Sequence, residues 1–344
     1  MVPGAMPSGF QGAFEGLGRR SLPIVNCLET TSGRVPPCQA TPVCLLTQMS
    51  LLLSFKLTMK YLLLIAVLFW SISATAQEVT IGAFNLENLF DVWDDPYTSD
   101  GDPKPAPKLA PLGQAISAID ADILGVCEVE NTASLERVIS EHAPDAGFKH
   151  IFTQPTNSGR GIQLGLMSRY PVEKVTSYRF NTLSLPGDRR QWKLARDLLH
   201  ATVRVGEHEL HLFMAHFKSK RSSNGDPQSA AWRLAEATFA RSVIDDLLAQ
   251  NPQALIAFMG DLNDTANSQT LKALTGRDGL IDSHRGDLAR IPTYLRKPYR
   301  DRIDFILMSP ALAKHQTGAD TLRDPKKLKG SDHAPVTARF KLPQ

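Results

Sequence analysis

Acidic, amide and imidazole side chains recur at the ends of apolar runs along most of this 344-residue chain. Taken singly, each is best explained as a helix cap or a turn residue. Taken together, they supply hard oxygen ligands for a divalent ion and an imidazole that could activate water. Those are the requirements of metal-assisted phosphoester hydrolysis. The residues concerned are Asn85, Glu128, His216, Asp261, Asn263, Asp304, Asp332 and His333.

Asp304 interrupts the apolar run 302–309, where a buried carboxylate needs a partner. His333 precedes the last apolar run, so its imidazole is a suitable partner. A carboxylate that accepts a hydrogen bond from one ring nitrogen fixes the tautomer and raises the basicity of the other nitrogen. The sequence therefore predicts an oriented Asp304–His333 pair.

Glu128, Asp332 and the amide of Asn85 are predicted to hold Mg²⁺, with Mn²⁺ or Ca²⁺ as alternatives. A zinc cage is not indicated, because neither paired-cysteine nor HExxH spacing occurs. G-x-S-x-G, Walker and GxGxxG patterns are also absent from the sequence. Serine-nucleophile, nucleotide-driven and nicotinamide chemistry are therefore not indicated.

Residues 59–76 have the layout of a signal peptide that starts at Met59 and is cleaved after Ala76. The alternative is a membrane anchor, but the apolar run 61–70 is far shorter than the roughly 20 residues of a spanning helix. We therefore expect a secreted or periplasmic protein without stable membrane insertion after cleavage. Residues 1–58 are interpreted as a mis-assigned upstream start or a disordered extension.

Cleavage after Ala76 removes five basic and two acidic residues from totals of 38 and 35, which leaves a formally neutral chain. Attraction for a polyanion must then be local. Cys127 is the one cysteine that remains, so the exported chain is expected to fold without internal disulfides.

Apolar β-branched runs alternate with helical stretches, which favours an α/β or α+β sheet protein. No repeat or linker divides the chain, so residues 77–344 are expected to form one domain. Helices are expected at 112–120 and 226–250. Strands are expected at 78–85, 122–128, 162–168, 198–205, 208–216, 254–264, 302–309 and 334–342.

Motifs in a characteristic order resemble the endonuclease/exonuclease/phosphatase superfamily with the deoxyribonuclease-I-like fold. The resemblance extends over nearly all of residues 78–341 and implies a four-layer α/β sandwich, with two central mixed sheets flanked by helices. The matching stretches are FNLENLF with Asn85, ILGVCEVEN with Glu128, GIQLGLMSRYPV, ARDLL with Arg196, MAHFKSK with His216, GDLND with Asp261 and Asn263, RIDFIL with Asp304, and SDHAPV with Asp332 and His333.

The resemblance also implies roles for these residues. Catalytic roles fall to His333, Asp304, His216, Asp261 and Asn263; metal binding falls to Glu128, Asn85 and Asp332; and phosphate binding falls to Arg196, Lys218 and Lys220. Gln163 departs from the pattern, because secreted relatives often have an acid there. It leaves the acidic partner of His216 unidentified.

Basic stretches beside these motifs, including HFKSK, suit contacts with a phosphate backbone, and HFKSK resembles the histidine motif of secreted bacterial nucleases. The expected function is a secreted, non-specific, metal-dependent endonuclease that hydrolyses DNA, RNA or both and acts as a monomer. One alternative is a secreted phosphatase or phosphodiesterase acting on lipid headgroups or small phosphoesters. Another is a catalytically silent binding module on the same fold.

Overall fold

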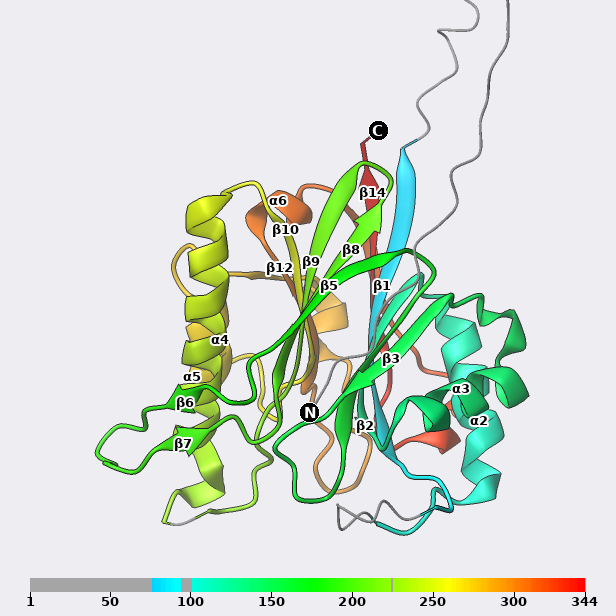
Figure 1. Cartoon of the computed structure of the whole chain (residues 1–344), viewed down its shortest axis with the longest axis horizontal. Coiled ribbons are helices and arrows are strands. Elements are labelled where there is room, and N and C mark those ends of the chain that lie inside the picture. Colours follow the sequence, from blue (N-terminus) through cyan, green and yellow to red (C-terminus); the bar gives the residue numbers. More distant parts are fainter. Residues whose placement is uncertain (1–75, 94–100, 224, 344) are drawn as a thin grey trace, which may run out of the picture. The chain divides into compact units, whose positions relative to one another are not determined.

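Two mixed sheets of six strands each form the centre of the protein (Figure 1). The structure is a computed structural model that describes residues 76–93, 101–223 and 225–343. In the order in which they pair, the strands of the first sheet are β13 (Gln316–Thr321), β14 (Val336–Leu342), β1 (Gln77–Leu89), β2 (Ile123–Val129), β4 (Gln163–Ser168) and β3 (His150–Gln154).

The second sheet has the same size and comes mostly from the later part of the chain. Its strands, again in pairing order, are β11 (Ile281–Asp282), β12 (Asp304–Met308), β10 (Leu255–Asp261), β9 (His208–His216), β8 (Leu198–Val205) and β5 (Val172–Ser177). Strands β8 and β9 form the expected hairpin, which turns at Gly206 with a φ of +59°. A positive φ at that turn suits glycine, which has no Cβ.

Each sheet has one parallel pair at its centre, β1–β2 in the first and β9–β10 in the second, and its other pairs are antiparallel. In the second sheet this pattern puts His216, at the end of β9, opposite Asp261, at the end of β10. Strand β12 runs the other way, so its first residue, Asp304, also pairs with Asp261. Polar residues from three strands thus meet at one edge of the sheet.

The apolar core is divided into three layers by the two sheets. Side chains from the facing sides of both sheets make the central layer. Helices α2 (Ala106–Ile119) and α3 (Thr132–His142) pack on the outer face of the first sheet, and α4 (Ala230–Gln250) and α5 (Gln269–Thr275) pack on that of the second (Figure 1). This arrangement confirms the predicted four-layer α/β sandwich with two central mixed sheets flanked by helices.

Short elements complete the fold. A small hairpin of β6 (Thr182–Leu183) and β7 (Trp192–Lys193) projects beside α4 (Figure 1). The others are α6 (Pro310–Ala313), η1 (Pro144–Ala146), η2 (Pro227–Ser229), η3 (Gly286–Arg290) and η4 (Lys327–Gly330).

Within the described ranges, no helix combines the length and the apolar character needed to cross a membrane. The predicted signal peptide, 59–76, lies outside the described residues except for Ala76, and the proposed extension, 1–58, lies wholly outside them. Cys127 is buried, and it is unbridged among the described residues, as expected for a chain without internal disulfides.

Several boundaries differ from the sequence-based expectation, and two of them shape the site. Strand β1 continues past Asn85 to Leu89, although the chain takes the left-handed conformation at Glu87 and Asn88, with φ of 49° and 52°. The buried ammonium of Lys104 holds this bend by donating to the carbonyl oxygens of Leu86 and Glu87 at 2.9 and 2.8 Å. Asp304 begins β12 instead of interrupting it, which places its carboxylate at the edge of the sheet.

Candidate active site

An open cleft of about 1010 Å³ lies at the edge where the polar strand ends converge. Asn85 and Asp304 do not line it, but each hydrogen-bonds a residue that does. The structure therefore brings all the sequence-predicted site residues to one place. Those that line the cleft are Glu128, Arg196, His216, Lys218, Lys220, Asp261, Asn263, Asp332 and His333.

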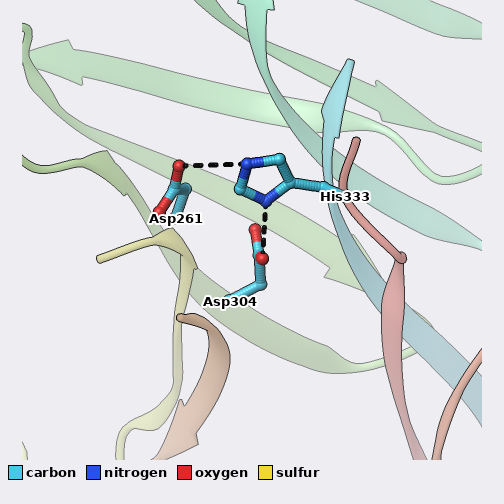
Figure 2. A group of neighbouring side chains, drawn as sticks. All are labelled: Asp261, Asp304 and His333. Carbon is cyan, nitrogen blue, oxygen red and sulfur yellow. Dashed lines mark hydrogen bonds and ion pairs between the residues drawn. The ribbon is translucent and has the colours of Figure 1, made fainter. Parts of the chain in front are cut away.

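His333 is held from two sides. Its Nδ1 lies 2.8 Å from Oδ2 of Asp304, and its backbone N–H donates to Oγ of Ser331 at 3.0 Å (Figure 2). Ser331 in turn donates to the carbonyl oxygen of Asn85 at 2.7 Å, which ties the loop before β14 to β1. With Nδ1 engaged, Nε2 is the ring nitrogen left to act in the cleft that His333 lines.

The charge state of His333 follows from its acidic neighbours. Burial lowers the pKa of His333, but the negative charge and hydrogen bond of Asp304, with Asp261 and Asp332 adding to them, outweigh burial and raise it to about 10. The imidazole is therefore protonated at neutral pH in the metal-free protein. A protonated imidazole is a charged hydrogen-bond donor.

Asp261 lies at the centre of the group. Its Oδ2 lies 3.8 Å from Nε2 of His333 (Figure 2). The same oxygen accepts a hydrogen bond from Asn85 at 3.0 Å and lies 3.6 Å from Nε2 of His216. Its Oδ1 accepts from the backbone N–H of Asn263 at 2.9 Å. Burial raises the pKa of Asp261, which makes its carboxylate a stronger base than an exposed one.

Gly260 allows the end of β10 to take this position. Its φ is +134°, and a Cβ at this residue would lie 2.0 Å from the carbonyl oxygen of Ala215 on β9. A larger residue would therefore push the two strand ends apart. The glycine is needed for the pairing that sets Asp261 beside His216.

His216 is neutral, because burial, together with the positive charges of Arg196, His333 and Arg160, holds its pKa well below the usual value. Its Nε2 lies 3.7 Å from Oε1 of Glu128. With Gln163 unable to supply a charge, Glu128 and Asp261 are the acids that face this histidine.

Glu128 and Asp332 provide carboxylates at the floor of the cleft, and Glu87 lies nearby. Burial raises the pKa of Asp332, and the like charges of Glu87 and Glu128 raise it further against the lowering effect of His333. The negative charges of these carboxylates repel one another, so the group is suited to bind a divalent cation that would offset the repulsion. The amide oxygen of Asn85 is less suited to this role, because it accepts from the backbone N–H of Glu87 at 2.9 Å.

A second group with possible metal ligands consists of Asp261, Asp304 and His333, whose candidate atoms lie within 4.8 Å of one another. Its histidine and Asp304 are already joined by the 2.8 Å hydrogen bond (Figure 2). We therefore interpret this group as one that moves or holds protons, and Glu128 with Asp332 as the metal ligands.

Basic residues also line the cleft. Arg196 and the amide of Asn263 both donate to the carbonyl oxygen of Phe217, at 3.1 and 3.0 Å. Arg196 lines the cleft, and its buried Nε has no hydrogen-bond partner among the described residues. Lys220 is half-exposed and lies 3.5 Å from Asp264, whereas Lys218 donates to the carbonyl oxygen of Arg221 at 3.3 Å.

Glu236 on α4 joins the two loops that carry these cations. Its carboxylate oxygens accept from the backbone N–H groups of Ala195 and Lys218, each at 2.7 Å. Burial raises the pKa of Glu236 to about 7. The sequence did not single out this residue, because glutamate on a long helix is usually exposed.

Because its folded-state pKa lies above the usual 4.5, Glu236 contributes stability that is full below about pH 4.5 and is lost as the pH rises through about 7. We expect Glu236→Gln to remove this dependence. The free energy of unfolding of the wild type should fall relative to that of the variant by about 3 kcal/mol between pH 4.5 and 8, from about 1.4 kcal/mol per pKa unit. Urea denaturation across this pH range measures the difference, and parallel profiles would contradict the assignment.

Several cleft residues were not predicted from the sequence. Glu87 lies within the first motif, but only the bend at its positive φ turns it toward the site. Arg160 reaches Glu128 at 3.6 Å from a separate loop. Trp232, in the first turn of α4, also lines the cleft. Each depends on a tertiary contact for which the sequence has no local signal.

Comparisons with known proteins agree with this fold. Residues 80–285, more than half of the chain, match the profile of the Endonuclease/Exonuclease/phosphatase family. A comparison with curated protein sequences found no match.

Three similar solved structures illustrate the shared fold. A truncated Caenorhabditis elegans TDP2 is 20% identical over 77% of this chain and 98% of its own, with a TM-score of 0.53. The human Nocturnin catalytic domain with bound sulfate is 15% identical over 77% and 94%, with a TM-score of 0.55. An endonuclease/exonuclease/phosphatase family protein from Bacteroides thetaiotaomicron is 19% identical over 77% and 98%, with a TM-score of 0.53.

At these identities the solved structures show the fold, and the profile match shows the family. The strand-end residues and the cleft are consistent with both. The chain belongs to the Endonuclease/Exonuclease/phosphatase family, whose members are metal-dependent phosphoester hydrolases.

Proposed function

We propose that the chain is a divalent-metal-dependent phosphodiesterase that cleaves nucleic acid internally and with little sequence preference. The observation that carries this proposal is the Asp304–His333–Asp261 group at a cleft that is lined by both carboxylates and cations. The chemistry is that of water attack on a phosphodiester.

Glu128 and Asp332 would hold the divalent ion, with Mg²⁺ favoured and Mn²⁺ or Ca²⁺ as alternatives. When bound, such an ion neutralises charge on the phosphate and orients it for attack. Because both ligands are carboxylates, a hard cation suits them better than a soft one.

The other residues act on water and phosphate. At neutral pH the protonated His333 donates through Nε2 to a phosphate oxygen, and Asp304 holds its ring in place. Asp261, with its raised pKa, then accepts the proton of the attacking water. The neutral His216 and the guanidinium of Arg196 line the cleft and are placed to stabilise charge that develops on the phosphate and the leaving oxygen.

The shape of the cleft favours a polymer over a small phosphoester. It is open to solvent, and the cations on its walls come from loops far apart in the sequence, including Arg160, Lys218, Arg221 and Arg296. Such positions suit successive phosphates of one strand, and contacts of this kind carry no base information. We propose a nucleic acid strand as the substrate and export through the signal peptide at 59–76 as the route to it.

The test is hydrolysis by residues 77–344 of plasmid DNA, RNA, inositol phosphates and sphingomyelin, each with Mg²⁺, Mn²⁺ or EDTA. We expect relaxed and then linear plasmid in the presence of metal and intact plasmid in EDTA. Agarose gels measure the DNA products and phosphate release measures the others.

If inositol phosphates or sphingomyelin are hydrolysed and nucleic acid stays intact, the proposed active site is supported but nucleic acid is rejected as its substrate. No turnover of any phosphoester, with the protein folded by circular dichroism, would favour a binding module. The location of the protein is tested separately, by expressing the chain from Met59 and assaying the periplasm and the medium.

A further inference from the structure

Trp232, in the first turn of α4, contributes an indole ring to the wall of the catalytic cleft. The ring is fixed by its neighbours: Nε1 donates to the carbonyl oxygen of Lys193 at 2.9 Å, and Trp192 packs against it with centroids 4.6 Å apart and planes at 66°. Trp192 is itself 8% exposed. The buried Trp192 therefore supports the ring of Trp232 from behind.

A cation lies next to this ring. The ammonium of Lys218 is 5.6 Å from the centroid of the indole. Among the described residues no carboxylate lies within ion-pair distance of Lys218, and its flexible stem leaves the ammonium free to move to a phosphate. The aromatic face thus becomes accessible when an anion draws the ammonium away.

The position of this pair relates it to the phosphate site. Lys218 directly follows Phe217, whose carbonyl oxygen accepts hydrogen bonds from Arg196 and Asn263. Glu236 fixes the same peptide by accepting from the backbone N–H of Lys218. The ring of Trp232 and the ammonium of Lys218 are therefore held close to Arg196 and Asn263, because Lys218 is one residue from Phe217. We expect Arg196 and Asn263 to face the cleaved phosphate.

A phosphate next to a flat ring is the chemistry of a nucleotide. Building on the proposed function, we propose that Trp232 stacks on an unpaired nucleobase beside the cleaved phosphate, so that the cleft takes single-stranded nucleic acid in preference to duplex. In a duplex each base is covered on both faces by its neighbours, and exposing one costs unstacking and unpairing energy. In a single strand the face is accessible, and stacking tolerates any base.

The experiment compares three substrates with one backbone: a thymidine oligonucleotide, the same strand with its bases removed, and the thymidine strand paired with its complement. We expect the wild type to have a kcat/KM about tenfold or more higher on the base-bearing single strand than on the other two, since one stacked base is worth roughly five- to 150-fold. In Trp232→Leu the base-bearing and base-free single strands should be cleaved at equal rates.

Two further variants separate stacking from folding. Trp232→Phe keeps an aromatic ring and should retain most of the preference for bases. Trp93→Leu replaces a tryptophan that is 78% exposed and does not line the cleft, and it should behave as the wild type does. Thermal melting checks that all variants are folded.

The proposal fails if Trp232→Leu slows cleavage of base-bearing and base-free strands by the same factor, because the ring would then have only a structural role. It also fails if the wild type cleaves the duplex as fast as the single strand. If the wild type cleaves neither these three substrates nor RNA but hydrolyses inositol phosphates or sphingomyelin, the proposed function itself is rejected.

Discussion

Replacing His333 with alanine is expected to lower kcat/KM on plasmid DNA by about a thousandfold. The variant loses the charged donor toward the phosphate and leaves Asp304, which is 1% exposed, without its hydrogen-bonded cation. Loss of a positioned proton donor or acceptor typically costs 10²–10⁴-fold in rate. Initial rates of nicking at saturating metal measure the effect.

Because an unpaired buried carboxylate also destabilises a fold, a second variant is needed. Asp304→Asn keeps the shape of the side chain but removes the charge that holds the His333 ring, and it should cost about a hundredfold in kcat. His150→Ala, at the start of β3 and outside the cleft, is the matched control and should keep its rate. A folded His333→Ala with a rate near that of the wild type would exclude this histidine from the chemistry.

Glu128→Gln is expected to raise the Mg²⁺ concentration that gives half-maximal activity by at least about a hundredfold. The substitution keeps the size of the side chain and removes its charge, so Asp332 is left as the single carboxylate of the predicted metal pair. Even residues that only support metal ligands change metal affinity by about 10–100-fold. Activity as a function of Mg²⁺ measures the change, and calorimetric titration with Mn²⁺ measures binding without turnover.

Glu136→Gln, on the exposed face of α3, controls for a general loss of negative charge. It should leave both the metal dependence and the calorimetric titration unchanged. If Glu128→Gln binds Mn²⁺ as the wild type does, the metal lies elsewhere, and Asp261 with Asp304 and His333 becomes the alternative set.

The long apolar runs predicted the strands of the fold well. The 208–216 run became β9 and the 198–205 run became β8 with the same bounds, because two adjacent apolar runs joined by a short glycine turn specify a hairpin locally. The two-residue strands β6, β7 and β11 were not predicted, since so short a run has no period to detect. Their pairing depends on what packs against them.

The sequence predicted which residues form the site better than it predicted their charge states and contacts. Asp304 and His333 were expected to pair because a carboxylate in an apolar run needs a partner, and they lie 2.8 Å apart. The neutral state of His216 and the protonated state of His333 were not foreseeable, because each depends on charges brought together by folding. Trp232 was indistinguishable from a core residue until Trp192 was seen to occupy the core position behind it.

The site can form only after β1 has paired with β14, which is the last strand. Asn85 follows the segment of β1 that pairs with β14, and His333 precedes β14. Ser331 joins the two by donating a hydrogen bond to the carbonyl oxygen of Asn85. A growing or half-folded chain that lacks β14 therefore has Glu128, the proposed metal ligand, but lacks Asp332 and His333. Return of activity after denaturation would then report the final closure of the first sheet, later than the return of helical signal.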